Sequence, residues 1–223
     1  MAKIDKTLAL HGLKYPYRNM LSSFADKIKF IHPDIISFAA FFETMAVGIL
    51  FYFSGSRPIL LIVNLFLIFL RMTLNTLDGL IALKIGRTTK KGELVNALPD
   101  RYADMFIMIG ISLSSLCDIK IGLIASITVL LVSYSGMLGK ALGVSWQSHG
   151  PLDKVDRLIL ILIATLAQFI LIKMNRPELS ILGFSFTVIE WCMLLFILLG
   201  QITVINRVLG MIKEINTVEK TGK

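Results

Sequence analysis

Blocks of apolar residues, each close to twenty residues long, follow one another along the chain. An α-helix needs about 20 consecutive apolar residues to cross a bilayer. Only 17% of the 223 residues are charged, whereas soluble domains have about a quarter. The pattern predicts an all-α polytopic membrane protein with six transmembrane helices, over residues 35–53, 59–83, 93–116, 121–138, 157–172 and 181–205.

Three regions are expected along the chain. Residues 1–34 mix Lys and Arg with Leu, Met and Phe, a basic amphipathic pattern that suits a helix lying in the membrane interface. They lack the continuous apolar run of a cleavable signal peptide, so the first span is expected to stay in the mature protein. Residues 35–210 form the transmembrane domain, which contains the candidate catalytic residues, and residues 211–223 form a basic C-terminal tail.

Lysine and arginine are unevenly distributed over the connections between the predicted spans. With both termini in the cytoplasm, seventeen of these residues flank the cytoplasmic side and four flank the opposite side. Because cytoplasmic loops carry an excess of Lys and Arg, the distribution predicts that both termini are cytoplasmic. The net charge of +8 fits this topology and an attraction to anionic lipid headgroups, and is not interpreted as nucleic-acid binding.

Polar and charged side chains interrupt the second and third predicted spans. Asn75 and Asp78 are three residues apart, and Asn96, Asp100 and Asp104 are spaced by four, so each group shares one face of its helix. The short basic loop between the two spans makes them antiparallel neighbours, and we expect the two polar faces to meet near the cytoplasmic end. Carboxylates are costly to keep inside a membrane, which makes this stretch the first candidate functional site.

The residue types at this candidate site suit a cation. Oxygen ligands from two helices, without His or Cys, favour a hard cation such as Mg²⁺, with Mn²⁺ or Ca²⁺ as alternatives. Gly79 and Ala82 remove side-chain bulk beside Asp78, which would let a ligand approach the backbone. A purely structural interpretation stays open: the Asn and Asp side chains would then be interhelical hydrogen-bond partners, with Arg101 paired to a neighbouring aspartate.

This stretch resembles the motif of the CDP-alcohol phosphotransferases, D-x2-D-G-x2-A-R-x8-G-x3-D-x3-D. The spacing is kept throughout, and the sequence reads Asn75-x2-Asp78-Gly79-x2-Ala82-Leu83-x8-Gly92-x3-Asn96-x3-Asp100. The six-span layout with a preceding interfacial helix also resembles the family. The first and third aspartates are asparagines here and the arginine is a leucine, a pattern similar to a divergent branch with asparagine at both positions.

The resemblance implies a transferase of phospholipid biosynthesis in a bacterial or archaeal cytoplasmic membrane, with its active site facing the cytoplasm. Members move a phosphatidyl-type group from a CDP-linked lipid, such as CDP-diacylglycerol, to a small polar alcohol and release CMP. They use Mg²⁺ or Mn²⁺ as cofactor. Carried over by position, Asp100 is the catalytic base, the metal ligands are Asn75, Asp78, Asn96 and Asp100, and Gly79, Ala82 and Gly92 are substrate-binding residues. Asp104 is expected as a further metal ligand, and Arg71, Lys84, Thr89 and Arg157 as further substrate-binding residues.

Two of these residues are expected to compensate for the departures from the motif. Asp104 is a candidate to restore one lost charge, and Lys84 is a candidate to replace the arginine lost at Leu83. A homodimer is a further expectation from the resemblance. The alternatives are a catalytically lapsed relative that binds CDP-lipid or nucleotide without transfer, and a small transporter or channel subunit. The identity of the acceptor alcohol is not encoded in the motif.

Overall fold

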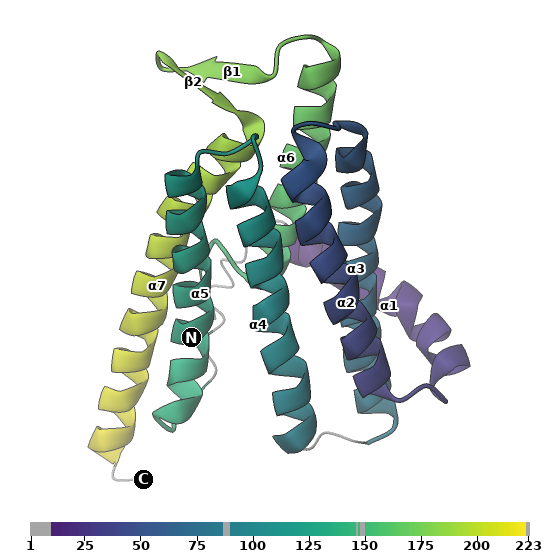
Figure 1. Cartoon of the computed structure of the whole chain (residues 1–223). Coiled ribbons are helices and arrows are strands. Elements are labelled where there is room, and N and C mark those ends of the chain that lie inside the picture. Colours follow the sequence, from purple (N-terminus) through teal and green to yellow (C-terminus); the bar gives the residue numbers. More distant parts are fainter. Residues whose placement is uncertain (1–9, 87–89, 146, 148–149, 222–223) are drawn as a thin grey trace.

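The computed structural model describes residues 10–86, 90–145, 147 and 150–221. This part of the chain forms a helical bundle with a short β-hairpin at one end (Figure 1). Its elements are α1 (Leu10–Ile28), α2 (Pro33–Ser54), α3 (Ile59–Lys84), α4 (Lys90–Leu113), α5 (Ile119–Ala141), α6 (Lys154–Lys173), β1 (Glu178–Ile181), β2 (Phe184–Thr187) and α7 (Val188–Thr221).

Helices α2 to α7 correspond in order to the six predicted spans. Within the described residues, five of them, α2, α3, α5, α6 and α7, are long and apolar enough to cross a membrane. Helix α4 is not among the five, because Asp100, Arg101 and Asp104 add to the charges of its first turns. It nevertheless packs against both α2 and α5 inside the bundle. The protein is thus a mostly helical, polytopic chain, and crossing of the membrane by α4 remains a prediction.

The last helix begins later than the sequence predicts. Residues 178–187 form an antiparallel hairpin, with Glu178 opposite Thr187 and Ile181 opposite Phe184, so the predicted start of a span near Ile181 is wrong. The turn is made by Leu182 and Gly183, both with positive φ, which is the backbone of a tight hairpin turn. Apart from this short hairpin the described residues are mostly helical, which is consistent with the all-α expectation. Helix α7 then continues to Thr221, through the residues predicted to form a tail.

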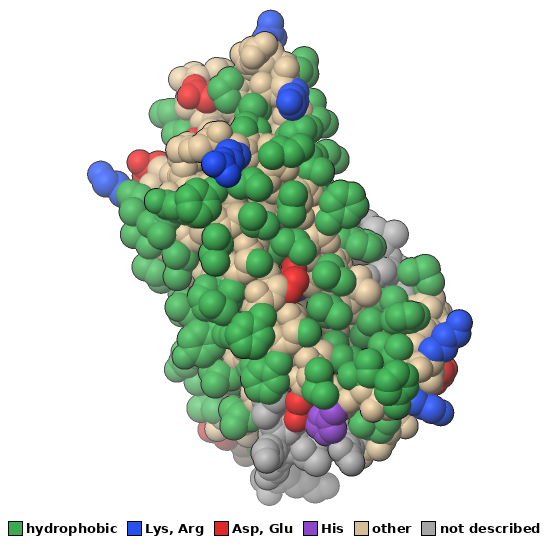
Figure 2. All heavy atoms as spheres, turned by 45° about the vertical axis from the view of Figure 1, so that its right-hand side comes forward, with side chains coloured by type: hydrophobic (Ala, Val, Ile, Leu, Met, Phe, Trp, Pro, Cys, Tyr) green, Lys and Arg blue, Asp and Glu red, His purple; other side chains and the backbone are tan. Residues whose placement is uncertain are grey.

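Large apolar side chains cover much of the outer surface of the bundle. Figure 2 shows hydrophobic side chains spread over the face that includes α2 and α3. Phe42, Phe66 and Phe69 are each more than half exposed there. A contiguous apolar surface of this extent would be unfavourable in water and is typical of helices that face lipid. Together with the five apolar helices, it identifies an integral membrane protein.

The inner packing fixes α4 against α2. Gly48 on α2 and Gly110 on α4 lie where the two helices cross, and a Cβ atom on Gly110 would overlap the backbone of Gly48. Glycine at both positions lets the two backbones touch, as small residues do at close membrane helix crossings. Nearby, Val47, Phe51 and Ile107 are almost fully buried in the main core.

Helix α7 holds the connection between α5 and α6. The Glu214 carboxylate accepts hydrogen bonds from Ser145 N at 2.7 Å and from Gln147 Nε2 at 3.2 Å. Nearer the start of the same helix, the Arg207 guanidinium lies 3.4 Å from the Asp153 carboxylate. Asp153 N in turn donates to Asp156 at 3.1 Å, which caps the start of α6. These contacts fix where α6 begins, and therefore where its first side chains point.

Helix α1 lies outside the main bundle and packs at an angle on the C-terminal half of α3 (Figure 1). Leu21 and Ala25 of α1 are buried against Leu77 and Ile81 of α3. The placement of the N-terminal segment in the membrane interface remains a prediction.

Candidate active site

Three helices bring polar side chains together inside the bundle. Asn75 is on α3, Asp100 is on α4, and Lys154 is the first residue of α6. The side chain of Asn75 lies between Asp100 Oδ1 and Lys154 Nζ, and these neighbours assign its amide orientation. In that orientation the amide donates to Asp100 Oδ1 at 3.2 Å and accepts from Lys154 Nζ at 2.8 Å. The predicted meeting of the polar faces of the second and third spans is therefore confirmed by the Asn75–Asp100 contact.

Asp78 is buried one turn from Asn75. Ser37 Oγ of α2 donates to its Oδ2 at 2.9 Å, and Gly79 N donates to its Oδ1 at 2.6 Å. It also interacts electrostatically with Asp100 and Lys154, which places the two carboxylates in one polar cluster. Because a Cβ atom on Gly79 would meet nothing within 4 Å, there is open space beside this carboxylate.

Two cationic side chains lie against the carboxylate of Asp100. Its Oδ1 lies 3.5 Å from the Arg71 guanidinium, and its Oδ2 lies 2.5 Å from Lys154 Nζ. Arg71 is almost fully buried and also donates to Thr44 Oγ1 at 2.6 Å. Its Nε has no hydrogen-bond acceptor among the described residues, and its Nη2 is the nitrogen that faces Asp100 at 3.5 Å. The Nε–H group is therefore available to an anion that enters the site.

Asp104 lies one turn deeper and is paired with arginines. Its Oδ2 accepts from Arg157 at 2.8 Å and lies 3.4 Å from Arg101. The Asp104 and Arg157 side chains are only 6% and 5% exposed. The structural interpretation of Arg101 as a partner of Asp104 is thus confirmed. Arg157, expected at the substrate, is part of this buried pair.

The other predicted residues lie around this centre. Lys84, the candidate replacement for the motif arginine, is bonded instead to Asp26 of α1 at 2.6 Å and to the Ser22 carbonyl at 2.9 Å. Ala82 is partly buried in the last turns of α3. Thr89 lies outside the described residues. Gly92 and Asn96 are in the first turns of α4, and the side chain of Asn96 is also outside the described part.

The donor set fits a hard cation. In the part of the chain that the structure describes, no group of three or more His, Cys, Asp or Glu side chains is close enough to hold a metal ion. The cluster instead combines two carboxylates, Asp78 and Asp100, with the Asn75 amide. The Lys154 ammonium lies against Asn75 and Asp100, so a positive charge already stands where oxygen donors converge. Oxygen ligands of this kind suit Mg²⁺ or Mn²⁺.

Sequence reasoning did not single out Lys154, Ser37 or Thr44. Lys154 is 54 residues from Asp100, and the two hydroxyl residues are on another helix. The usable signal is the three-residue spacing of Lys154 and Arg157, which places both on one face of a helix that starts before the predicted fifth span.

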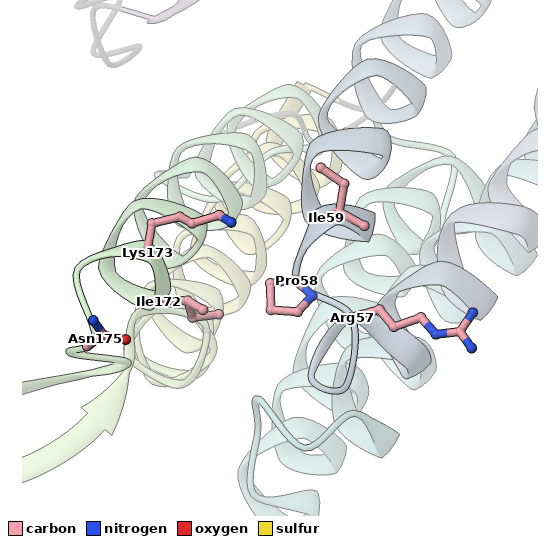
Figure 3. Close-up of a pocket in the computed structure, with 6 residues that line it drawn as sticks. All are labelled: Arg57, Pro58, Ile59, Ile172, Lys173 and Asn175. Atoms are coloured by element: carbon pink, nitrogen blue, oxygen red, sulfur yellow. The ribbon is translucent and has the colours of Figure 1, made fainter.

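A hollow lies at the opposite end of the bundle (Figure 3). It has a volume of about 470 Å³ and is lined by Arg57, Pro58 and Ile59 at the start of α3, and by Ile172, Lys173 and Asn175 at the end of α6. None of the residues of the motif lines it, so this hollow is separate from the α3–α4–α6 cluster.

Two archaeal proteins resemble this chain along much of its length. The archaetidylinositol phosphate synthase of Methanothermobacter thermautotrophicus is 29% identical over 171 residues, which cover 77% of this chain and 84% of the relative. The archaetidylinositol phosphate synthase of Pyrococcus horikoshii is 28% identical over 138 residues, covering 61% and 70%. No protein-family model matches the chain.

The fold is shared with the phosphatidylinositol phosphate synthase PgsA1 of Mycobacterium tuberculosis. The crystal structure of that protein with CDP-DAG bound superposes with a TM-score of 0.66 at 18% identity, over 86% of this chain and 94% of the other. Its complex with manganese and citrate gives a TM-score of 0.65 at 18% identity, over 87% and 88%. These similarities confirm the resemblance to the CDP-alcohol phosphotransferase family, of which these relatives are members. Within the shared fold, the Asn75–Asp78–Asp100 cluster lies on the two helices that carry the motif.

Proposed function

We propose that the protein transfers a phosphatidyl-type group from a CDP-linked lipid to a small polar alcohol and releases CMP. The observation that carries the proposal is the convergence of Asn75, Asp78 and Asp100, from the two halves of the spaced motif, into one cluster. The similarity to archaetidylinositol phosphate synthases supports the same reaction class.

In the proposed reaction the alcohol oxygen attacks the lipid-bearing phosphorus of the donor. The bond from that phosphorus to the diphosphate bridging oxygen breaks, and the bridging oxygen leaves with CMP. The alcohol proton passes to a carboxylate oxygen of Asp100. This carboxylate is suited to the role because it is partly exposed, at 17%, whereas Asp78 and Asp104 are buried.

Charged groups of the cluster would hold the diphosphate. The Arg71 guanidinium, whose Nε has no acceptor among the described residues, supplies positive charge, and the open space beside Gly79 leaves room for the nucleotide. A divalent metal, held by Asn75, Asp78 and Asp100, would neutralise diphosphate charge when bound. We assign Asn96 to the same set from its place in the motif, whereas Asp104, engaged by two arginines, stabilises the helix packing.

The test is CMP release by the purified protein in lipid nanodiscs. Donors are CDP-diacylglycerol and CDP-archaeol, acceptors are inositol phosphate, glycerol phosphate and serine, and metals are Mg²⁺ and Mn²⁺. We expect acceptor-dependent release in at least one combination, with about a hundredfold loss in Asp78→Asn and Asp100→Asn. Glu178→Gln, exposed on the hairpin at the other end, is the matched control and should keep full activity. Binding of CDP-lipid without CMP release under either metal would favour the lapsed relative instead.

A further inference from the structure

The ammonium group of Lys154 contacts the same oxygen atoms that the proposed metal site requires. Lys154 Nζ lies 2.5 Å from Asp100 Oδ2 and 2.8 Å from the Asn75 side-chain oxygen. Asp78 is within electrostatic range of the same ammonium. A cation is therefore already bound at the converging oxygens, and it is supplied by the chain itself.

The amide at position 75 makes this arrangement possible. Its nitrogen donates to Asp100 while its oxygen accepts from Lys154, so one side chain links the carboxylate and the ammonium. A carboxylate at position 75 could accept from Lys154 but could not donate to Asp100, because an ionised carboxylate has no proton to give. The asparagine at position 75, where the family motif has an aspartate, therefore allows Lys154 and Asp100 to be linked through one side chain.

The charges of the cluster are balanced in this state. Asp78 and Asp100 contribute two negative charges, and Arg71 and Lys154 contribute two positive charges. A divalent cation bound to Asn75 and Asp100 would lie within a few ångströms of the Lys154 ammonium, where like charges repel strongly in a poorly solvated site. The metal and the ammonium cannot occupy these oxygens together.

Lys154 is able to leave the cluster. It is the first residue of α6, its side chain is 24% exposed, and its ammonium is carried on a flexible four-carbon stem. Arg71, by contrast, is held inside the bundle by Thr44 and the Ala40 carbonyl. Of the two cations beside Asp100, only Lys154 can move without opening the helix packing.

We propose that Lys154 is a tethered cation that competes with the divalent metal for Asn75 and Asp100. It occupies these oxygens in the metal-free protein and leaves them when the metal binds. This inference rests on the metal site of the proposed function and adds that metal occupancy is limited by a residue of the chain. Lys154 acts through the metal site and is a positioning residue.

The direct test is Mn²⁺ affinity, measured by electron paramagnetic resonance on the purified protein in nanodiscs without donor or acceptor. Lys154→Met should bind Mn²⁺ at least about tenfold more tightly than the wild type, because the competing charge is gone. Lys154→Arg, which keeps the charge, should retain the weak affinity. Lys173→Met removes one ammonium at the far end of the bundle and should change nothing. Equal or weaker affinity in Lys154→Met would overturn the inference.

A second measurement does not depend on the folding of any variant. Acetylation of Lys154 in the wild-type protein, quantified by mass spectrometry, should rise severalfold when Mn²⁺ is added, while Lys173 is unaffected. Labelling that is insensitive to Mn²⁺ would contradict displacement of the ammonium. CMP release is scored separately, so an inactive protein whose Lys154→Met variant binds Mn²⁺ more tightly rejects the proposed reaction and keeps this inference.

Discussion

Arg157 of α6 donates a 2.8 Å hydrogen bond to Asp104 of α4, and both side chains are almost completely buried. This pair joins the helix that carries Lys154 to the helix that carries Asp100. Removing Arg157 would leave the buried Asp104 carboxylate with only the longer 3.4 Å contact to Arg101, which is more costly than removing both partners of the pair.

We therefore expect Arg157→Met to lower the free energy of unfolding by about 3 kcal/mol, measured by denaturant titration in detergent micelles. The double variant Arg157→Met with Asp104→Leu should recover a large part of this loss, because the buried carboxylate is removed as well and Arg101, the other partner of Asp104, is partly exposed. Lys173→Met, which is exposed, is the matched single-charge control and should stay close to the wild type. A double variant that is as unstable as the single one would argue against the pair as the cause.

Asn75→Asp tests the role of the amide. The substitution adds a carboxylate at the first motif position and removes the donor to Asp100. We expect about tenfold tighter Mn²⁺ binding and a less stable metal-free protein, because two carboxylates then face each other. Asn175→Asp, exposed near the opposite end, makes the same chemical change and should leave Mn²⁺ affinity unaltered. The stability of the metal-free protein is followed by thermal unfolding in a chelating buffer.

Substitutions at two glycines should distinguish an effect on stability from an effect on activity. Gly110→Ala should destabilise the bundle by about 2 kcal/mol, because its Cβ would overlap the Gly48 backbone. Gly79→Ala should leave thermal stability unchanged, since nothing lies within 4 Å of the added methyl group. If the nucleotide fills that space, Gly79→Ala will nevertheless reduce CMP release. A stable variant with unchanged KM for CDP-lipid would show that the donor binds elsewhere.

Glu214→Ala should loosen the α5–α6 connection. The carboxylate accepts from the backbone nitrogen and the hydroxyl of Ser145, and both bonds disappear in the variant. Hydrogen exchange followed by mass spectrometry should show faster exchange in the segment around residue 145, with a smaller increase in Glu214→Gln. Glu219→Ala, exposed on the same helix, is the control for loss of charge. Unchanged exchange in Glu214→Ala would mean that other contacts hold the connection.

Cys117 should be unreactive in the folded protein. It lies in the turn between α4 and α5, where burial, with the nearby Glu190 and Asp118 carboxylates, raises the pKa of its thiol to about 12. The thiolate that reacts with maleimide is therefore almost absent at pH 7 to 9. Labelling in mild detergent should be negligible up to pH 9 and become complete after unfolding in dodecyl sulfate. Rapid labelling at neutral pH would show that this turn opens.

The part of the site that depends on local spacing could be predicted from the sequence. Asn75 and Asp100 are placed by helical periodicity on two helices joined by a short loop, and they meet as expected. Lys154 could not be predicted to join them, because its position depends on where α6 starts and on the contacts of α7 with the preceding connection. For the same reason Lys84, close to the motif in sequence, lies instead against α1.

The β-hairpin shows a second limit of predicting the structure from the sequence. Residues 181–186 are mostly apolar and lie just before α7, so composition alone extends the span back to Ile181. Their alternation and the glycine at position 183 indicate a hairpin, but a period of two over four residues is too short to override the longer apolar run. At the other extreme, the charges of α4 make it the least apolar of the six helices, although it packs inside the bundle.

The backbone contact between Gly48 and Gly110 fixes the relative depth of α2 and α4. These helices cannot slide past each other there without a clash of main chains, so Asp100 stays at a constant depth relative to Ser37 and its partner Asp78. Binding of a metal or a lipid headgroup then has to leave this crossing in place. In the proposed exchange, the ammonium of Lys154 gives way to another cation while the acidic side chains keep their spacing.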